Sequence, residues 1–493
     1  MPSAGRDQLP DFHPTTLIRD WGAGQGFRLA DAQTGVCVFG ATGSGKTSGP
    51  AKHLALGYLA HDFGGLVLCA KKEERRQWEQ WAADTGRGDD LIIVDAGGEW
   101  CFNFLNWEAT RAGEGGGLTI NIVALLDEIA GAIISGSSGK TEGEGDGKFF
   151  RDALHHMNTN LVDLPRLAGY EVTLPLMREI VNTAPMTPTE AKNDAWRRGS
   201  TCAAIIEAAD QATAGADPDT RADFQECKTY WENEFPNLND RTRSIVVLYF
   251  SMLVRPFITR PLRRLFAEQT TVTPEAAFEG KVILIDLPVQ EFRLAGRVAN
   301  LAWKYCFQVA VMRRTPPPRG YLRPVFLWAD EAQNFVTEFD AEYQAVARSA
   351  GGCTVYLTQN RESFRRVLGG NDTVDSLLGN LQAKFLCQNS SVDTNEWAAD
   401  LLGQRWVDVV STNVGRSSDQ QAGSSSSLSG GVSRSEERRY FVEPAQFATL
   451  KRGGEANQFQ VQAIVYNGGH LFRSGADARG EPLPYTLLTF NQR

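Results

Sequence analysis

Residues 36–47 read VCVFGATGSGKT, and this stretch decides the fold class. The run VCVF, at 36–39, is typical of a buried strand, and residues 40–47 match the pattern GxxxxGK[ST] of a phosphate-binding loop. The segment that follows favours a helix, with Pro50 in its first turn, where proline is tolerated. A strand, a glycine-rich turn and a helix in this order predict an α/β nucleotide-binding core.

The loop would act through its backbone and two side chains. Its glycines let backbone N–H groups turn inward around a phosphate, and the helix N-terminus adds a partial positive charge. Lys46 should reach the β- and γ-phosphates, and the Thr47 hydroxyl should bind Mg²⁺. We therefore expect ATP and Mg²⁺ as cofactors; the alternative is a glycine turn that matches the pattern by chance. The nucleotide-binding residues would be Gly40, Ala41, Thr42, Gly43, Ser44, Gly45, Lys46 and Thr47.

Two further strand ends carry polar residues. The run VFLWA at 325–329 leads to Asp330, expected to hold the magnesium ion, and Glu331, expected to deprotonate the attacking water. The run at 353–357 leads to Gln359, whose amide could bind both that water and the γ-phosphate. The alternatives are a surface strand end for the first run and a polar cluster that merely ends a strand for the second.

Similar apolar runs recur along the chain. Several end at a polar or glycine turn that precedes a helix-like segment, which is typical of parallel strands with crossover helices. Between about residues 120 and 250 the periodicity becomes helical. We predict an α/β core at 1–119 and 251–493, with an all-helical domain inserted at 120–250. The predicted strands lie at 35–39, 65–69, 91–94, 282–287, 325–329, 353–357, 384–387 and 460–466.

Two stretches are predicted to be mobile loops. Residues 135–148 read SGSSGKTEGEGDGK, and residues 411–435 are rich in serine and glycine. Neither composition offers enough apolar surface to offset the entropy lost on ordering.

The bulk composition limits the function classes. With 50 Lys and Arg against 59 Asp and Glu, the net charge of -9 gives no global attraction to nucleic acid or to an anionic membrane. The eight cysteines form no CxxC pair, which indicates buried, reduced thiols. No stretch approaches the roughly 18–20 apolar residues of a membrane span. We expect a cytoplasmic protein without direct membrane insertion.

The motifs, taken in order, resemble the TraG/TraD type of type IV secretion coupling protein, within the HerA/FtsK class of RecA-like motors. Residues 70–73 stand in place of the family's Asp-x-Lys-Gly-Glu, and 102–106 resemble its Phe-Asn-Pro-Leu. The segment 347–352, Gln359 and the pair 368–369 resemble its Arg-x-x-Gly, Gln and Tyr-Gly series. Membrane-anchored members begin with transmembrane helices, whereas only about 35 residues precede the first predicted strand here, which indicates a soluble variant.

The resemblance implies a RecA-like core, a ring-shaped homo-oligomer with six members, and DNA as the substrate. It makes Arg348 an arginine finger supplied to the γ-phosphate of a neighbouring subunit; the alternative is an exposed helix arginine. It also implies protein partners, namely a relaxase, an effector or a membrane component that recruits the chain to the inner membrane.

Two arginine clusters could line a DNA pore, or could be solvated faces or subunit contacts. The first is at 255–264 and the second at 313–323. The leading hypothesis is an ATP-hydrolysing motor that translocates DNA in conjugative transfer or a related process. The alternative is an assembly or regulatory ATPase, for example of an anti-phage or mobile-element complex, in which nucleotide controls oligomerisation and a partner supplies the activity.

Overall fold

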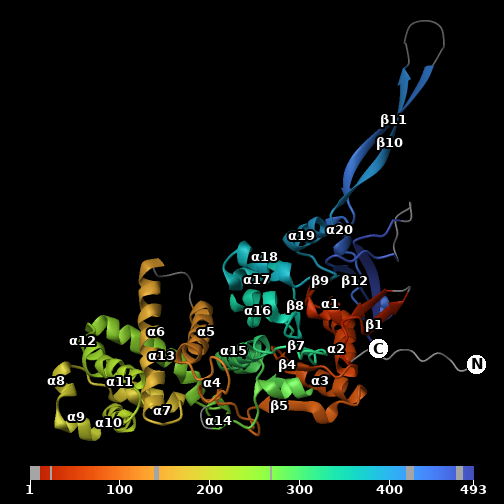
Figure 1. Cartoon of the computed structure of the whole chain (residues 1–493). Helices are drawn as coiled ribbons and strands as arrows, with labels where there is room; N and C mark the ends of the chain where they lie inside the picture. The colour runs from red at the N-terminus through yellow and green to blue at the C-terminus, as the bar shows by residue number, and fades with distance from the viewer. Residues whose placement is uncertain (1–10, 23–24, 138–143, 267–268, 418–426, 474–480) are drawn as a thin grey trace, which may run out of the picture.

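A nine-stranded sheet forms the centre of the protein, as Figure 1 shows for the computed structural model, which describes residues 11–22, 25–137, 144–266, 269–417, 427–473 and 481–493. The strand order is β13-β12-β9-β3-β8-β7-β4-β6-β5. The seven strands from β9 to β5 are parallel, and β12 and β13 are antiparallel at one edge. The strands are β3 (Val36–Phe39), β4 (Gly64–Leu68), β5 (Leu91–Asp95), β6 (Val282–Asp286), β7 (Val325–Ala329), β8 (Gly352–Thr358), β9 (Ala383–Cys387), β12 (Gln460–Asn467) and β13 (Tyr485–Asn491).

The strands from β9 to β6 are buried on both faces, which explains why they are apolar throughout, whereas the edge strand β13 alternates buried and exposed residues. On β3, Val36 and Val38 pack into the core under helices α2 (Lys52–Ala60) and α3 (Glu73–Asp84). Cys37 and Phe39 pack into the core of the opposite face, which includes α15 (Val289–Met312). The predicted α/β class with a mainly parallel sheet is confirmed, and all eight predicted strands are present within one or two residues of their expected bounds.

Sequence reasoning missed two parts of the β-structure. The edge strand β13 escaped notice, as did a separate hairpin of β1 (Leu17–Gly22) and β2 (Gln25–Arg28) near the start of the described chain. Other short helices complete the core: α1 (Leu29–Gln33), α16 (Phe339–Ala347), α17 (Arg361–Leu368), α18 (Asn371–Asn380), α19 (Val392–Leu402) and α20 (Pro444–Phe447).

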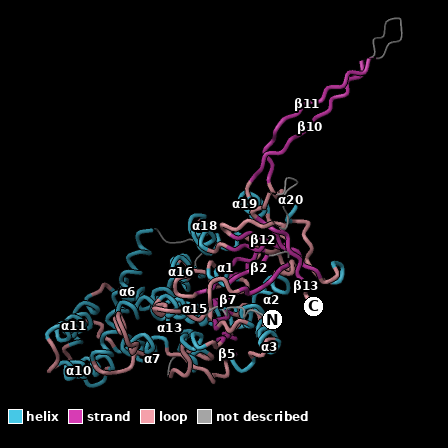
Figure 2. The backbone as a smooth tube through the Cα atoms, turned by 45° about the vertical axis from the view of Figure 1, so that its right-hand side comes forward, coloured by secondary structure: helices cyan, strands magenta, loops and turns pink. Residues whose placement is uncertain are grey.

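A helical region lies to one side of the sheet, on the left of Figure 1 and in cyan in Figure 2. Polar side chains cap several of its helices by accepting backbone N–H groups, as Ser200 does for Ala203 and Asn239 does for Thr242. The helices are α4 (Phe104–Ala109), α5 (Thr119–Ser137), α6 (Glu144–Leu167), α7 (Leu174–Thr183), α8 (Pro188–Ala191), α9 (Asp194–Gly199), α10 (Thr201–Thr213), α11 (Pro218–Thr229), α12 (Phe235–Asn237), α13 (Asp240–Ile258) and α14 (Leu262–Phe266).

A two-stranded ribbon projects from the body of the protein (Figures 1 and 2). It consists of β10 (Gln404–Ser417) and β11 (Ser427–Tyr440), paired over 14 positions, and we call it the arm. At about 3.4 Å per residue each strand is about 45 Å long.

The arm corrects the prediction of a loop at 411–435. Residues 411–417 and 427–435 are strand. Their serine-rich composition provides no hydrophobic core, but cross-strand hydrogen bonds satisfy the backbone N–H and C=O groups. The loop predicted at 135–148 is also wrong in part, since 135–137 end α5 and 144–148 begin α6. The remaining positions of the two stretches, 418–426 and 138–143, lie outside the described residues.

All eight cysteines are buried and unpaired, as the sequence predicted. In the described part of the chain, no helix combines the length and the apolar character needed to cross a membrane.

Candidate nucleotide site

The loop 40–47 follows β3 and is held at its base by the neighbouring strands. The Gly40 N–H donates to the Thr358 oxygen at 3.2 Å, and the Ala41 N–H donates to the Gln388 oxygen at 2.9 Å. Gly45 has a φ of +81°, and a Cβ there would lie 2.4 Å from Val461 Cγ2. A side chain at this position would therefore be strained and would clash, which is why the loop requires glycine.

The loop opens into a cavity suited to a polyanion. The cavity has a volume of about 390 Å³. Ser44 Oγ is buried in the loop without a hydrogen-bond partner among the described residues. The chain continues from Thr47 into a helical turn, Thr47–Ala51, and then α2, which directs a helix N-terminus at the loop. The cavity is lined by Thr42, Gly43, Ser44, Gly45, Lys46, Thr47, Ser48, Lys52, Lys71, Gln77, Trp81 and Glu331.

Thr47 and Asp330 are in direct contact. The Thr47 hydroxyl donates to Asp330 Oδ2 at 2.7 Å, and Asp330 Oδ1 accepts the Glu331 N–H at 2.8 Å. The registers of β3 with β8 and of β8 with β7 bring the carboxyl ends of these strands to one edge of the sheet, which places the two side chains together. A hydroxyl and a carboxylate oxygen are ligands that suit Mg²⁺.

Glu331 lies between two lysines and two amides. Its Oε1 is 2.7 Å from Lys71 Nζ and 3.5 Å from Lys46 Nζ. Its Oε2 accepts from Gln333 Nε2 at 2.7 Å and from Gln359 Nε2 at 3.3 Å. Burial alone would raise the pKa of Glu331, but Lys46, Lys71 and the Gln333 hydrogen bond outweigh it and lower the pKa to about 2.

The backbone of Glu331 is strained. Its φ of 50° and ψ of 49° are in the left-handed region, which non-glycine residues rarely adopt. Such strain is characteristic of functional sites, where surrounding contacts impose it. Here the left-handed turn directly follows Asp330, so both carboxylates remain at the end of β7.

The predicted site residues therefore fall into two groups. Lys46, Asp330, Glu331 and Gln359 lie together with Thr47 at the carboxyl edge of the sheet. Arg348 does not join them, because it follows α16 and precedes β8, at the amino edge. The seven residues of β8 separate the two edges by about 20 Å. The Arg348 side chain is exposed.

Sequence reasoning missed three residues at the site. Lys71 occupies the lysine position of the family pattern quoted above, and this was the available signal. Gln333 bridges Glu331 and Thr358, whose hydroxyl donates to Gln333 Oε1 at 3.1 Å; no motif marked it. Glu74 accepts the Lys71 N–H at 3.0 Å, and its burial raises its pKa well above the usual value.

Two arginines of the second cluster make contacts within the chain. Arg313 makes a two-pronged contact with the buried Glu108, at 2.7 and 2.9 Å. Arg314 donates to the Ala350 and Arg323 oxygens at 3.0 and 2.7 Å. These two groups bind parts of the same chain, whereas Arg319 of the cluster is exposed, and a role of 313–323 in DNA contact stays a prediction.

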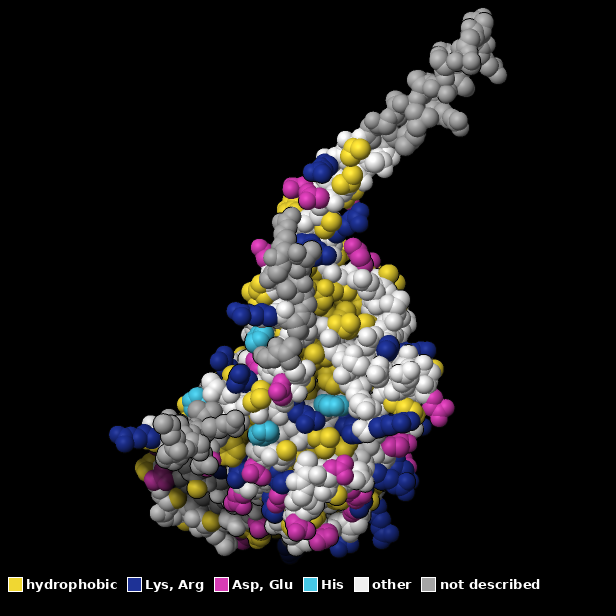
Figure 3. Space-filling model, turned by 90° about the vertical axis from the view of Figure 1, so that its right-hand side faces the viewer, with side chains coloured by type: hydrophobic (Ala, Val, Ile, Leu, Met, Phe, Trp, Pro, Cys, Tyr) yellow, Lys and Arg dark blue, Asp and Glu magenta, His cyan; other side chains and the backbone are white. Residues whose placement is uncertain are grey.

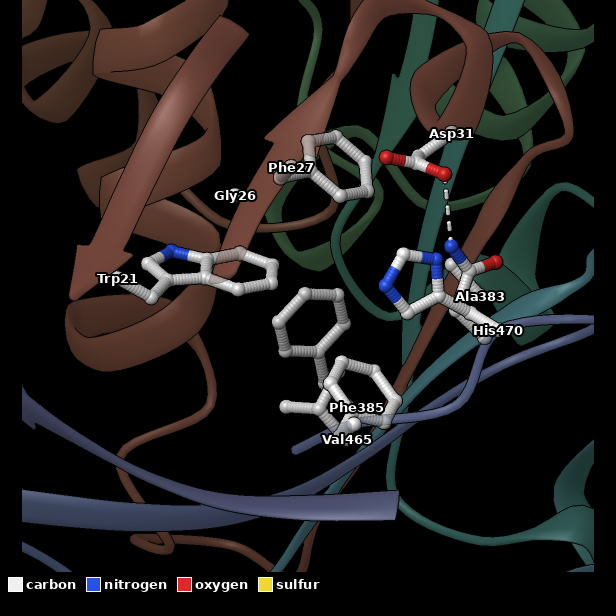
Figure 4. Close-up of a pocket in the computed structure, with 10 residues that line it drawn as sticks. Trp21, Gly26, Phe27, Asp31, Ala383, Phe385, Val465 and His470 are labelled. Atoms are coloured by element: carbon white, nitrogen blue, oxygen red, sulfur yellow. Dashed lines mark hydrogen bonds between the residues drawn. The ribbon is translucent and has the colours of Figure 1, made fainter. Parts of the chain in front are cut away.

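Two other cavities are less suited to a nucleotide. One of about 360 Å³ lies between α5, α15 and α16. The other, of about 10 Å³, lies between Trp21, Phe27 and Phe385, where Asn467 donates to Asp31 at 2.8 Å (Figure 4). That volume holds at most one water molecule.

Comparison with known proteins bears out the resemblance. Residues 324–452 match a family model described as the TraM recognition site of TraD and TraG. This segment contains β7, Glu331, Gln359 and the arm. No curated protein matches the chain.

Solved structures of similar fold extend the likeness to almost the whole chain. The bacterial conjugative coupling protein TrwBdeltaN70, in its unbound monoclinic form, is 15% identical with a TM-score of 0.61, over 98% of this chain and 90% of that one. The plasmid coupling protein TrwB in complex with ADP and Mg²⁺ is 14% identical with a TM-score of 0.58, over 99% and 90% of the two chains. The chain is therefore similar in fold to the conjugative coupling protein TrwB, and its residues 324–452 match the TraD and TraG family.

Proposed function

We propose that the protein is an oligomeric ATPase that translocates DNA in conjugative transfer or a related process. The observation that carries this proposal is the meeting of the loop lysine, the Thr47–Asp330 pair and Glu331 around one cavity. This arrangement supplies a phosphate cradle, magnesium ligands and a base, which are the parts that phosphoryl transfer needs. TrwB, of similar fold, has been solved with ADP and Mg²⁺, which supports the choice of cofactors.

In the proposed reaction, each side chain has a separate task. The loop N–H groups and Lys46 bind the phosphates, while Thr47 and Asp330 hold the magnesium ion, which neutralises charge on the phosphates. Glu331 orients the attacking water and accepts its proton, and Gln359 positions that water through its amide. We also propose that the chain binds and hydrolyses ATP rather than transferring the phosphoryl group to another substrate.

Arg348 supports an oligomer. It lies on the opposite edge of the sheet from the loop, so it cannot reach the γ-phosphate of its own chain. A neighbouring copy that presents its α16 to the cavity would supply the guanidinium, as an arginine finger does. A closed ring, which we propose has six members, would give every site such a neighbour.

The partner surface is proposed to include the arm. The cross-strand register puts Trp406, Val410 and Val432 on one face, where they are 61%, 56% and 68% exposed. Figure 3 shows hydrophobic side chains among charged ones along this ribbon. A two-stranded ribbon without a core is marginally stable alone, so a partner would stabilise it. We propose that a relaxase, an effector or a membrane component docks there and recruits the cytoplasmic chain to the inner membrane.

A second candidate function is an assembly or regulatory ATPase in which a partner supplies the activity. It is favoured by the internal contacts of Arg313 and Arg314, which engage two arginines of one candidate DNA patch, and by the net charge of -9. Both functions require the same nucleotide chemistry, so the response to DNA distinguishes them.

The distinguishing experiment measures ATP hydrolysis with and without double- and single-stranded DNA. ATP hydrolysis by wild type should be stimulated by at least one DNA form, while Lys46→Ala and Glu331→Gln should lose hydrolysis. Displacement of a protein block from DNA would show movement along it. Hydrolysis that ignores every DNA form, with no block displaced, would favour the assembly ATPase.

A further inference from the structure

Lys71 lies in the nucleotide cavity but has no part in the mechanism above. It follows β4, and its ammonium group is 2.7 Å from Glu331 Oε1. Its side chain is 40% exposed, against 7% for that of Lys46. The position of its main chain is fixed, because the buried Glu74 accepts the Lys71 N–H. The head of the side chain can therefore move while its base remains in place.

The Glu331 carboxylate has little acceptor capacity left in this arrangement. A carboxylate offers about four lone-pair directions. Oε1 faces the two lysines, and Oε2 accepts from the two glutamines. Lys71 and the two glutamines take three of these directions by hydrogen bonds, and the remaining one, on Oε1, faces Lys46 at 3.5 Å. The attacking water would have to share Oε1 with two ammonium groups unless one of them leaves.

Lys71 is the partner best placed to leave. The Thr358 hydroxyl holds Gln333 through its Oε1, so that amide is restrained from both sides. Lys71 is restrained only by Glu331 at its charged end, among the contacts of the described residues. Its long, flexible stem and compact charge suit an ammonium that exchanges one anion for another. The anion nearest to hand would be the terminal phosphate of a nucleotide in the same cavity.

We propose that Lys71 is a phosphate-sensing latch, which holds Glu331 in the absence of a triphosphate and moves to the γ-phosphate when ATP binds. This inference rests on the proposed ATPase function. The move frees a lone pair on Oε1 for the attacking water and adds a cation to the phosphate that is transferred. The base is thus released only when a γ-phosphate is present. No covalent bond changes in this step.

Lys72 provides a matched control. It is the next residue along the same loop, but its side chain is 73% exposed and pairs with Glu291 at 3.1 Å. It does not line the cavity. Lys72→Met therefore removes the same charge from the same loop without touching the latch.

The test compares the binding of a non-hydrolysable ATP analogue with the binding of ADP, both with Mg²⁺, by isothermal titration calorimetry. In Lys71→Met we expect affinity for the analogue to fall by about tenfold, as for one lost charge-assisted hydrogen bond, with ADP affinity changed by less than about threefold. Lys72→Met should leave both affinities within about twofold of wild type. The ratio of the two affinities is taken within one sample, so partial unfolding cancels.

A second background separates direct contact from simple charge neutralisation. If Lys71 exchanges Glu331 for the phosphate, Lys71→Met should lower the affinity for the analogue in Glu331→Ala by more than the roughly tenfold expected in wild type, because no carboxylate then competes for the ammonium group. If Lys71 only neutralises Glu331, the effect should vanish in that background, and the latch is overturned. An equal loss of affinity for the analogue and for ADP in Lys71→Met would also overturn the latch.

The outcomes also separate this inference from the proposed function. Wild type that binds neither nucleotide overturns the ATPase proposal and the latch with it. The latch alone is overturned if wild type binds the analogue in a Lys46-dependent manner and Lys71→Met leaves the ratio of analogue affinity to ADP affinity unchanged.

Discussion

Removal of the buried cation Lys304 should destabilise the protein strongly. Lys304 and Asp340 are each 1% exposed in their side chains, and Lys304 Nζ is 2.6 Å from Asp340 Oδ2. The same ammonium group donates to the Phe335 oxygen at 2.8 Å. Asp340 Oδ1 accepts from Tyr356 at 2.6 Å and from Gln308 at 2.7 Å. This network joins α15 to the segment that runs from Glu331 to α16.

In Lys304→Met, Asp340 keeps its neutral donors but loses its only cation among the described residues. Removing one partner of a buried ion pair costs about 3–5 kcal/mol, because the remaining charge is uncompensated. We expect a loss of that size in the free energy of unfolding. In Lys304→Met combined with Asp340→Asn, the buried charge is gone while the acceptor for Tyr356 remains, so the double variant should recover part of the loss.

The assay is urea unfolding followed by circular dichroism and tryptophan fluorescence. Lys281→Met is the matched control, since its pair with Asp90 is partly exposed and surface pairs contribute under about 1 kcal/mol. A loss below about 1 kcal/mol in Lys304→Met, or a double variant as unstable as the sum of the single ones, would refute this reasoning.

Three further predictions concern single charges. Arg348→Ala should bind nucleotide but lose hydrolysis. Mixing it with Lys46→Ala protomers should restore part of the ATP hydrolysis. A mixed oligomer without activity would argue against an arginine finger supplied in trans. Arg313→Met should lower the free energy of unfolding by about 1.5–3 kcal/mol, as for a lost hydrogen bond to a charged group, because Glu108 is buried but keeps Arg111 at 3.2 Å. It should leave the salt dependence of DNA binding unchanged in a filter-binding titration. Burial lowers the pKa of Lys384 from 10.5 to about 8. Between these pH values the unfolded chain therefore binds more protons than the folded chain. Wild type should gain stability relative to Lys384→Met as the pH rises from about 8 to 10.5. A constant difference between the two across this range, measured by urea unfolding, would contradict that assignment.

The parallel sheet could be predicted because its strands are buried on both faces. Continuous apolar runs such as 325–329 favour buried parallel strands, and the polar residues that follow such strands meet at the carboxyl edge of the sheet. The helical character of the inserted segment was predictable from its periodicity, while the division at 120 and 250 stays a prediction.

The arm could not be predicted from composition. Its serine and glycine residues have low strand propensity and bury little, so the sequence pattern indicates a loop. The ribbon forms through cross-strand pairing of two segments that bury no hydrophobic face against the body of the protein. Antiparallel pairing of this kind is set by register, which a single segment does not reveal.

The contacts of individual charged residues were equally hidden. Arg313 and Lys71 both occur beside a second basic residue, and either pair fits a solvated surface. Only the fold shows that Arg313 contacts Glu108, more than 200 positions earlier in the chain, and that Lys71 reaches Glu331. Sequence reasoning named Lys46, Glu331 and Gln359, which lie together, but it did not assign a role to Lys71 and had no motif for Gln333.

The central claim is that residues 40–47 bind a nucleotide together with the magnesium ligands Thr47 and Asp330. The most direct measurement is an equilibrium titration of wild type, Lys46→Ala and Asp330→Ala with a fluorescent ATP analogue, with Mg²⁺ and with EDTA. We predict that wild type binds the analogue more tightly with Mg²⁺, that Lys46→Ala loses at least about tenfold in affinity, and that Asp330→Ala loses the dependence on Mg²⁺. Equal binding by all three proteins, or none by wild type, would contradict the claim.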